Sequence, residues 1–539
     1  MPICQEIITF AFGKQLRLSS HLPEKLRCMT RKDKSTSISP AICPDALKLS
    51  FRNIMEPLLL MFNKAACIEL NNKPYYIAYS IPGGVYGYFK DYRVSREELD
   101  RICHRIRAMI NSGEEFKHEV LDRDRLHGYF EKNNRHDIVH LLNSKEPEDE
   151  PEGLRLAHLN GYGELLLNHI NGNHKHFQHD FRLLSCEDGF FLIADPDFFD
   201  RVMPEKPEQS KYFQGFYESE ETMKHLGIEN FAQLNDVIRE GRLPEFVKLS
   251  ETWQARRISR ITDDILTHPD HPRVILLAGP TSSGKTTSAH RLSLELKVMK
   301  KEVIMLSLDN YYLPHSEIAK DPETGMKNFE LITALDLELF RENINDLLAG
   351  KAVHLPKYHF DGEGARPEKE ATRIGKDTYI IVEGIHGLNP ELWHNMMDVA
   401  SYRLYVSALS TLNIHDHLPL STSDHRLVRR LVRDHLFRGY DFNETICRWP
   451  DVMQNEAQSI FPFQEKAHAF FNSALIYEPA VFAHYAPTVI HPAKAENDMV
   501  RNEVKRLNRM LGLLTPIDPK DIPPTSILRE FIGGSSFNY

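Results

Sequence analysis

Residues 279–287 combine glycines, hydroxyl side chains and one lysine in an order suited to binding phosphate. The run, which fits the pattern G-x-x-x-x-G-K-[ST], reads Gly279-Pro280-Thr281-Ser282-Ser283-Gly284-Lys285-Thr286-Thr287. It follows an apolar stretch and opens a helical one, so backbone N–H groups at a helix N-terminus can cradle ATP phosphates. Lys285 is expected to reach the β- and γ-phosphates, and Thr286 to hold Mg²⁺. The alternative is a glycine- and serine-rich turn with a surface lysine, which the combination of strand, motif and helix disfavours.

Two carboxylates follow two further apolar stretches. Asp309 ends the stretch 303–308, and Glu383 ends the stretch 379–382. Because the carboxyl ends of strands in an open α/β sheet face the ligand crevice, both side chains are expected beside the phosphate site. Asp309 is then placed to orient a hydroxyl nucleophile and take its proton, and Glu383 to hold Mg²⁺ directly or through water. The competing interpretation of Asp309 is a turn or helix cap.

Four arginines share one face of a predicted helix that begins near residue 424. At about 100° per residue they fall within an arc of roughly 100°, opposite Leu427 and Leu431. The pattern predicts a basic stripe that faces away from the core. A merely solvated face is the alternative, but beside a phosphate site a mobile arginine lid over the transferring phosphoryl group is favoured. The arginines are Arg426, Arg429, Arg430 and Arg433.

The elements that must position these residues alternate between apolar and helical stretches. Near-continuous apolar strands joined by helices predict a parallel sheet covered on both faces. We therefore expect an α/β P-loop domain over residues 271–500, with a core of its own. The expected strands are 274–278, 303–308, 378–382 and 402–406.

The first half of the chain has a different pattern. Short strands such as 75–81 and helices such as 96–110 are mixed there, which predicts an α+β domain. The predicted organisation is an irregular N-terminal arm over 1–45, the α+β domain over 46–245, a connecting helix over 246–270, the P-loop domain over 271–500, and a C-terminal helix and tail over 501–539.

Composition limits the class of protein. With 539 residues the chain exceeds a single core, and 41% hydrophobic and 26% charged residues are typical of globular proteins. A formal charge of −10 disfavours a protein that coats nucleic acid generally. Seven scattered cysteines, the lack of a signal-like start and the lack of a long apolar run predict a cytoplasmic protein without a membrane partner.

Together the motifs resemble the uridine kinase and phosphoribulokinase family of P-loop kinases. They occur in the family's order over residues 279–439. The matching stretches are the phosphate motif, Ser307-Leu-Asp-Asn-Tyr-Tyr, Asn328-Phe-Glu, Pro356-Lys-Tyr-His-Phe, Val382-Glu-Gly-Ile, and Arg429-Arg-Leu-Val-Arg-Asp with Arg438-Gly.

This resemblance implies ATP- and Mg²⁺-dependent phosphorylation of a nucleoside 5′-hydroxyl, with uridine the first candidate. Two departures leave pyrimidine selectivity open: Asp361-Gly-Glu363-Gly replaces a segment with a base-reading histidine, and Tyr440 replaces the last arginine of an R-G-R triplet. The roles implied are Asp309 as general base, Lys285 and Arg433 in catalysis, Arg438 at ATP, Glu330 at the ribose hydroxyls, and Tyr312, Tyr358 and Arg430 at the nucleoside.

A narrower resemblance is to long bacterial nucleoside kinases that carry a domain like the second additional domain of threonyl-tRNA synthetase. It is carried by Tyr405-Val-Ser-Ala-Leu-Ser-Thr-Leu-Asn-Ile, Ile460-Phe-Pro-Phe-Gln-Glu, Phe471-Asn-Ser-Ala-Leu and the tail from Ser526. It implies such a domain over residues 46–245, where RNA contact stays open, as does oligomer formation.

Two other functions remain as alternatives. One is a kinase for another small alcohol, such as a sugar phosphate or pantothenate, because the phosphate motif does not choose the acceptor. The other is a nucleotide-gated RNA-binding regulator. Asp309 and the arginines disfavour the regulator, since a switch needs no base on the acceptor side.

Overall fold

The computed structural model describes residues 50–145, 154–168, 180–318, 320, 327–359, 364–394, 399–490 and 495–538. The predicted arm over residues 1–45 and the departure at Asp361 and Glu363 lie outside the described residues. Within the rest, the elements of Asp45–Tyr539 form one compact unit.

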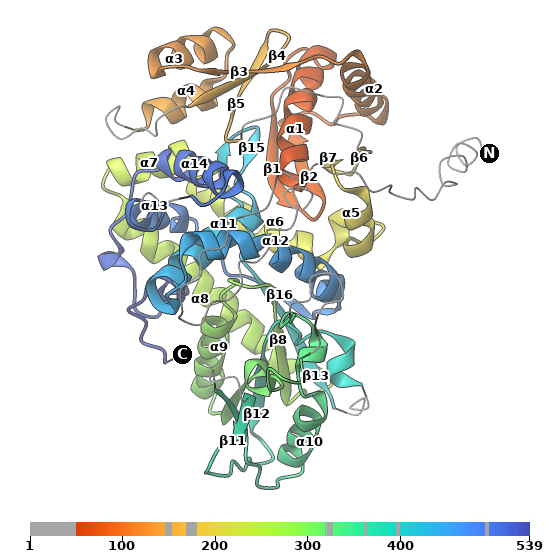
Figure 1. Ribbon diagram of the computed structural model, residues 1–539, viewed down its shortest axis with the longest axis vertical. Coiled ribbons are helices and arrows are strands. Elements are labelled where there is room, and N and C mark those ends of the chain that lie inside the picture. Colours follow the sequence, from red (N-terminus) through yellow and green to blue (C-terminus); the bar gives the residue numbers. More distant parts are fainter. Residues whose placement is uncertain are drawn as a thin grey trace, which may run out of the picture. The chain divides into compact units, whose positions relative to one another are not determined.

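A five-stranded parallel sheet occupies the second half of the chain, as predicted (Figure 1). All four neighbouring pairs run parallel. The four expected strands are confirmed to within one or two residues, and a short fifth strand joins them at one edge. The strand order is β16 (Ala469–Asn472), β13 (Ser401–Ser407), β8 (Val274–Ala278), β12 (Tyr379–Glu383) and β9 (Val303–Ser307).

Helices cover both faces of this sheet, which explains why its central strand β8 is apolar throughout. In β8, Ile275 and Leu277 join the core that contains α9 (Lys285–Val298), whereas Val274 and Leu276 join the core that contains α10 (Leu337–Leu348). Successive side chains of a strand point to opposite faces, so each face needs its own apolar residues. The α/β prediction is confirmed.

The first half forms two antiparallel sheets with helices, which agrees with the predicted α+β class. Its likeness to a synthetase domain stays a prediction. One sheet contains β1 (Tyr75–Ile81), β2 (Gly84–Phe89), β7 (Phe190–Ile193) and β6 (Arg182–Ser185), and the other contains β3 (Phe116–Val120), β4 (Arg155–Leu159) and β5 (Tyr162–Leu166). The helices are α1 (Ser50–Glu69), α2 (Arg96–Ser112), α3 (Arg123–Lys132), α4 (His136–Asn143), α5 (Pro196–Val202), α6 (Lys211–Leu226) and α7 (Phe231–Arg239).

The two halves are joined by more than the long helix α8 (Leu243–Thr267). A hairpin of β14 (Asn413–His415) and β15 (Leu418–Pro419) reaches β1. There the Ile77 N–H donates to the Asp416 carbonyl at 2.8 Å, and the Asn413 amide donates to the Ile77 carbonyl at 2.8 Å. One apolar cluster contains both Leu58 of α1 and Leu277 of β8. The core therefore continues across the predicted connecting helix.

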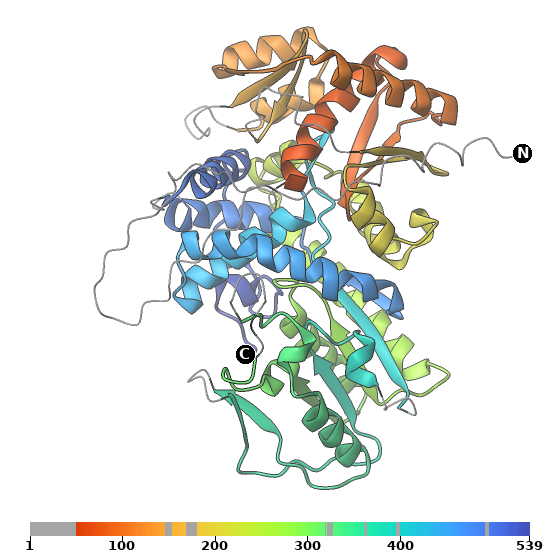
Figure 2. The same ribbon diagram turned by 45° about the vertical axis from the view of Figure 1, so that its right-hand side comes forward.

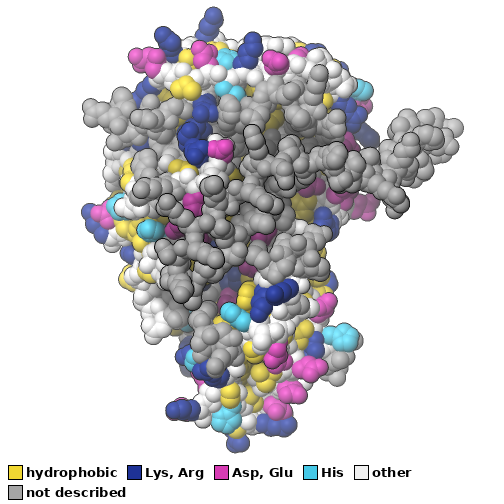
Figure 3. Space-filling view, in the orientation of Figure 1, with side chains coloured by type: hydrophobic (Ala, Val, Ile, Leu, Met, Phe, Trp, Pro, Cys, Tyr) yellow, Lys and Arg dark blue, Asp and Glu magenta, His cyan; other side chains and the backbone are white. Residues whose placement is uncertain are grey.

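Four of the remaining helices, α11 to α14, lie between the N-terminal sheets and the parallel sheet in both views (Figures 1 and 2). On the face drawn in Figure 3, basic and acidic side chains are interspersed over the lower half of the molecule. No helix among the described residues is long and apolar enough to cross a membrane. The remaining helices are α11 (Thr422–Arg433), a π-helical turn (Asp434–Arg438), α12 (Phe442–Ser459), α13 (Glu478–Val489), α14 (Asp498–Gly512) and α15 (Arg529–Ile532).

Candidate active site

The phosphate motif forms the loop between β8 and α9. Ser282 and Gly284 adopt left-handed backbone conformations, with φ of 57° and 78°. A Cβ at Gly279 would lie 2.0 Å from the Val406 carbonyl oxygen, so the chain can pass there only as glycine. Gly284 provides no side-chain cap for α9, which leaves the first N–H groups of the helix to be satisfied by another group.

The interior of the loop has the hydrogen-bonding character of an anion site. Lys285 is buried, and its Nζ donates to the Pro280 carbonyl at 3.0 Å, while Thr286 beside it is half-buried. The buried hydroxyls of Ser282 and Ser283 have no hydrogen-bond partner within the described part of the chain. Buried polar groups are normally satisfied. The loop therefore fits a phosphate group that would accept these bonds.

Both predicted carboxylates lie at the carboxyl edge of the sheet. Glu383 ends β12 opposite Ser307 of the neighbouring strand β9, and Asp309 follows two residues later. Burial raises the pKa of Glu383 to about 7, against the opposing charge of Lys285. Reduced hydration also raises the pKa of Asp309, and Lys285, Arg438 and Arg433 oppose the rise. The side chain of Asp309 is exposed at this edge of the sheet.

The alternative role for Asp309 is that of a helix cap, but other residues cap the helices near the site. The Ser307 hydroxyl accepts from the Asp309 N–H at 3.3 Å. Asp336 is the N-cap of α10 and accepts from the Leu339 N–H at 3.0 Å. Glu330 precedes this cap by six residues. The capping interpretation of Asp309 therefore loses its support.

The residues predicted to bind the phosphoryl acceptor include aromatic side chains that cluster beside this edge of the sheet. The ring of Tyr312 lies 5.9 Å from that of Tyr358 and 6.2 Å from that of Phe329. Tyr358 lies in β10 (Pro356–His359), and its N–H donates to the Asn310 amide oxygen at 3.1 Å. Glu330 follows Phe329. Burial raises the pKa of Glu330, and Arg430 and Lys285 oppose the rise.

The prediction that the four arginines of α11 face away from the core is wrong. The side chains of Arg430 and Arg433 are only 13% and 11% exposed, and the other two are buried completely. Arg426 is 1% exposed and donates to both carboxylate oxygens of Glu456, whereas Arg429 is 0% exposed and donates to both oxygens of Glu478. Glu456 lies on α12, and Glu478 begins α13. These helices cover the basic face of α11 and bring a carboxylate to each guanidinium. Helical periodicity identifies the shared face but not what packs on it.

The other two arginines, with Arg438, gather around one buried carboxylate. Asp434 is 2% exposed. Its oxygens lie 2.8 Å from Arg433, 3.2 Å from Arg430 and 3.8 Å from Arg438. Asp434 begins the π-helical turn, a geometry that is frequent at functional sites. Arg430, Arg433 and Arg438 are thus brought together, and the charges of Arg438 and Arg433 act on the carboxyl of Asp309.

Sequence reasoning missed the carboxylates that hold this site together. Besides binding Arg426, Glu456 accepts from the Thr281 N–H of the phosphate loop at 2.8 Å. Burial raises the pKa of Glu456 to about 7, and Arg426 opposes the rise. A signal was present, because Glu456 follows the buried Val452 at the i+4 spacing of one helix face. Asp434 offered a similar signal, because it lies at i,i+4 spacing from both Arg430 and Arg438.

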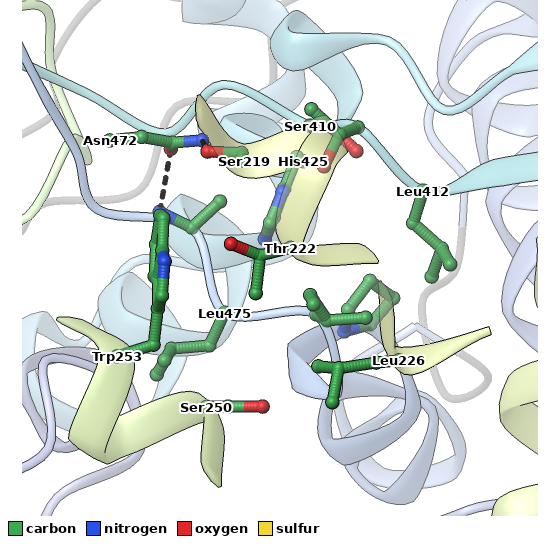
Figure 4. A pocket seen from close by; sticks show the side chains of 14 residues that line it. Ser219, Thr222, Leu226, Ser250, Trp253, Ser410, Leu412, His425, Asn472 and Leu475 are labelled. Atoms are coloured by element: carbon green, nitrogen blue, oxygen red, sulfur yellow. Dashed lines mark hydrogen bonds between the residues drawn. The ribbon is translucent and has the colours of Figure 1, made fainter. Parts of the chain in front are cut away.

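Two cavities extend beyond this group of residues. The smaller, about 30 Å³, is lined by Trp253 and by Asn472, whose amide donates to Ser219 at 2.8 Å (Figure 4). It has room for one or two waters. The larger, about 550 Å³, has Trp449 and Phe461 in its wall and reaches Pro280. Neither cavity is lined by the predicted acceptor residues.

Comparison with known proteins places these features in a family. The model of the phosphoribulokinase / uridine kinase family matches residues 274–476. A uridine kinase of Staphylococcus aureus (strain JH9) is 32% identical over 181 residues, which cover 34% of this chain and 77% of that protein. A uridine kinase of Brevibacillus brevis is 28% identical over 184 residues, which cover 34% of this chain and 76% of that protein. A solved structure of a possible uridine kinase from Bacillus stearothermophilus is 22% identical, with a TM-score of 0.23, and the match covers 28% of this chain and 79% of that one.

Proposed function

Since this chain belongs to the phosphoribulokinase / uridine kinase family, we propose that it transfers the terminal phosphoryl group of ATP to the 5′-hydroxyl of a nucleoside, with uridine the first candidate. The observation that carries the proposal is the electrostatic group around Asp309. Reduced hydration raises the pKa of this carboxyl, and the positive charges of Lys285, Arg438 and Arg433 oppose the rise. A carboxylate among phosphate-directed cations suits phosphoryl transfer to a hydroxyl.

The phosphate loop binds the donor in this proposal. Its amides and the hydroxyls of Ser282 and Ser283 bind phosphate oxygens, and Lys285 leaves the Pro280 carbonyl to reach the terminal phosphates. Thr286 and Glu383 offer the donor set that Mg²⁺ usually takes alongside substrate phosphates. An ion held by these residues would neutralise charge on the phosphate oxygens.

The acceptor side completes the reaction. Asp309 accepts the hydroxyl proton as the new oxygen–phosphorus bond forms and the bond to the leaving ADP breaks. Arg433 and Arg438 stabilise the charge on the transferring group. Glu330 accepts hydrogen bonds from the ribose hydroxyls, and the rings of Tyr312 and Tyr358 contact the base.

A substrate panel tests the proposal. The full-length chain with ATP and Mg²⁺ is offered ribonucleosides, sugar phosphates and pantothenate, and ADP release is measured. We expect a ribonucleoside to stimulate turnover strongly, and Lys285→Ala to abolish that stimulation without unfolding the protein. If only a sugar phosphate or pantothenate stimulated turnover, the acceptor would belong to that class of compound and would not be a nucleoside. Unchanged turnover in Lys285→Ala would contradict the role of the loop.

A further inference from the structure

The C-terminal segment brings a carboxylate onto the helix that carries the phosphate motif. Glu530 of α15 accepts two hydrogen bonds through Oε2, one from the Thr287 N–H at 3.1 Å and one from the Thr287 hydroxyl at 2.7 Å. Thr287 is fully buried in the first turn of α9. One of the helix N–H groups left open by Gly284 is thus satisfied by a residue 243 positions later in the chain.

The segment around Glu530 is firmly seated. Ile527 and Phe531 are both 0% exposed. A Cβ at Gly284 would lie 2.8 Å from Cγ2 of Ile527, so this segment passes directly over the phosphate loop. The ring of Phe531 lies 4.7 Å from the Arg429 guanidinium. These contacts fix the backbone that carries the carboxylate, but the side chain of Glu530 is only half-buried and can rotate.

The carboxylate belongs to the electrostatic environment of the site. Burial is the largest cause that raises the pKa of Glu383, and the charge of Lys285 opposes it. The negative charges of Asp309 and Glu530 raise this pKa further. A triphosphate is anionic, so it is attracted to the N–H groups at this helix N-terminus and can accept hydrogen bonds from them. A carboxylate and a phosphate oxygen are both acceptors with negative charge, so they compete for the same donors and repel each other when both are present.

We propose that Glu530 occupies a phosphate position of the nucleotide site and that the C-terminal segment thereby restrains nucleotide binding. This inference rests on the proposed function, because it takes the phosphate loop to bind ATP. Binding requires the side chain of Glu530 to leave Thr287. The apparent affinity for ATP is then reduced by the fraction of molecules in which the position is free.

Direct titration without an acceptor tests this, because it reads nucleotide binding separately from turnover. Mg²⁺-ATP and uncharged adenosine are titrated into the full-length wild type and into Glu530→Gln, which keeps the shape and removes the charge. We expect ATP to bind about tenfold more tightly to the variant and adenosine to bind equally to both. Asp521→Asn removes an exposed carboxylate of the same tail and is expected to change neither.

The alternative is that Glu530 is an ordinary helix cap. Glu530→Gln would then melt at a lower temperature and bind ATP equally or more weakly, and either binding result overturns the proposal. If Glu530→Gln does not fold, Glu530→Asp replaces it, because the shorter carboxylate does not reach Thr287 and should also tighten ATP binding. Absence of ATP binding to wild type and variant alike would contradict the proposed function itself.

Discussion

Arg433 donates two hydrogen bonds, of 2.8 and 3.0 Å, to one carboxylate oxygen of Asp434, the next residue in the chain. The same carboxylate also contacts Arg430 and Arg438. One buried anion thus gathers three cations, which would otherwise repel one another beside the phosphate loop. In the proposed reaction these cations are needed where charge develops on the phosphoryl group.

Asp434→Asn is therefore expected to lower kcat by about tenfold, because the arginines lose their common anchor, with a smaller effect on the KM for ATP. Steady-state kinetics of ADP release measure both. Asp346→Asn, which removes an exposed ion pair with Lys351, is the matched control and should leave both parameters unchanged. A raised kcat would show that Asp434 holds the arginines back.

Asp309→Asn keeps the shape of the side chain but removes the proposed base. We expect kcat to fall by roughly 10² to 10⁴ while direct titration shows nearly unchanged ATP binding. The raised pKa of Asp309 predicts that wild-type activity falls as the pH drops through that pKa and the carboxylate becomes protonated. A loss confined to ATP affinity would assign Asp309 to donor binding.

The buried pair of Arg429 and Glu478 supports the stability of the fold. Both side chains are 0% exposed, and the pKa of Glu478 is lowered from 4.5 to about 2, against burial, by the charge of Arg429. Glu478→Gln leaves a buried guanidinium without its counter-charge, which costs about 3 to 5 kcal/mol of the free energy of unfolding. Urea unfolding at neutral pH measures this cost.

The pH dependence of that difference has a definite sign. Because the pKa of Glu478 is lower in the folded state, its contribution is fully present above about 4.5 and is lost as the pH falls toward about 2. The difference in the free energy of unfolding between wild type and Glu478→Gln should become smaller over that pH interval. Glu240→Gln, which removes an exposed ion pair with Arg242, should show little difference at any pH.

Local patterns predicted the parts of the site that depend on local chemistry. The phosphate motif, the strand ends at Asp309 and Glu383 and the parallel sheet follow from residue type and spacing within short windows. The burial of Arg426 and Arg429 does not, because their carboxylate partners lie 30 and 49 residues later. Which distant element covers a helix face is decided by the whole core.

The same limit applies to the boundary between the halves. Sequence patterns predict that the P-loop domain has a core of its own, but His415 of β14 is fully buried and bonds to the Leu165 carbonyl of β5 at 2.9 Å. In addition, Arg509 of α14 donates to the Leu167 carbonyl at 2.6 Å. Deleting residues 1–245 uncovers these groups together with apolar surface. We expect the fragment 246–539 to be less soluble and to melt at a lower temperature than the full chain, as scanning calorimetry measures; an equally stable fragment would show that its core is independent.

The role proposed for Glu330 predicts that the nucleoside site prefers ribose over 2′-deoxyribose. Its pKa is raised by burial and held down by Arg430 and Lys285, so the carboxylate is partly desolvated and suited to accept hydrogen bonds from vicinal hydroxyls. A 2′-deoxynucleoside lacks one of these donors, and a hydrogen bond to a charged group contributes about 1.5 to 3 kcal/mol. At about 1.4 kcal/mol per tenfold, we expect a ribose preference of roughly 10- to 150-fold in kcat/KM.

Glu330→Gln should reduce that preference and lower the activity with the ribonucleoside, because a neutral amide accepts a weaker hydrogen bond than a carboxylate. The measurement is kcat/KM for uridine and deoxyuridine on wild type and variant. Glu338→Gln, an exposed change in the first turn of α10, is the matched control and should leave the ratio unaltered. Equal wild-type efficiencies for the two nucleosides, or a ratio that Glu330→Gln does not change, would remove Glu330 from the ribose site, since the hydroxyl contact is the only reason to expect either effect.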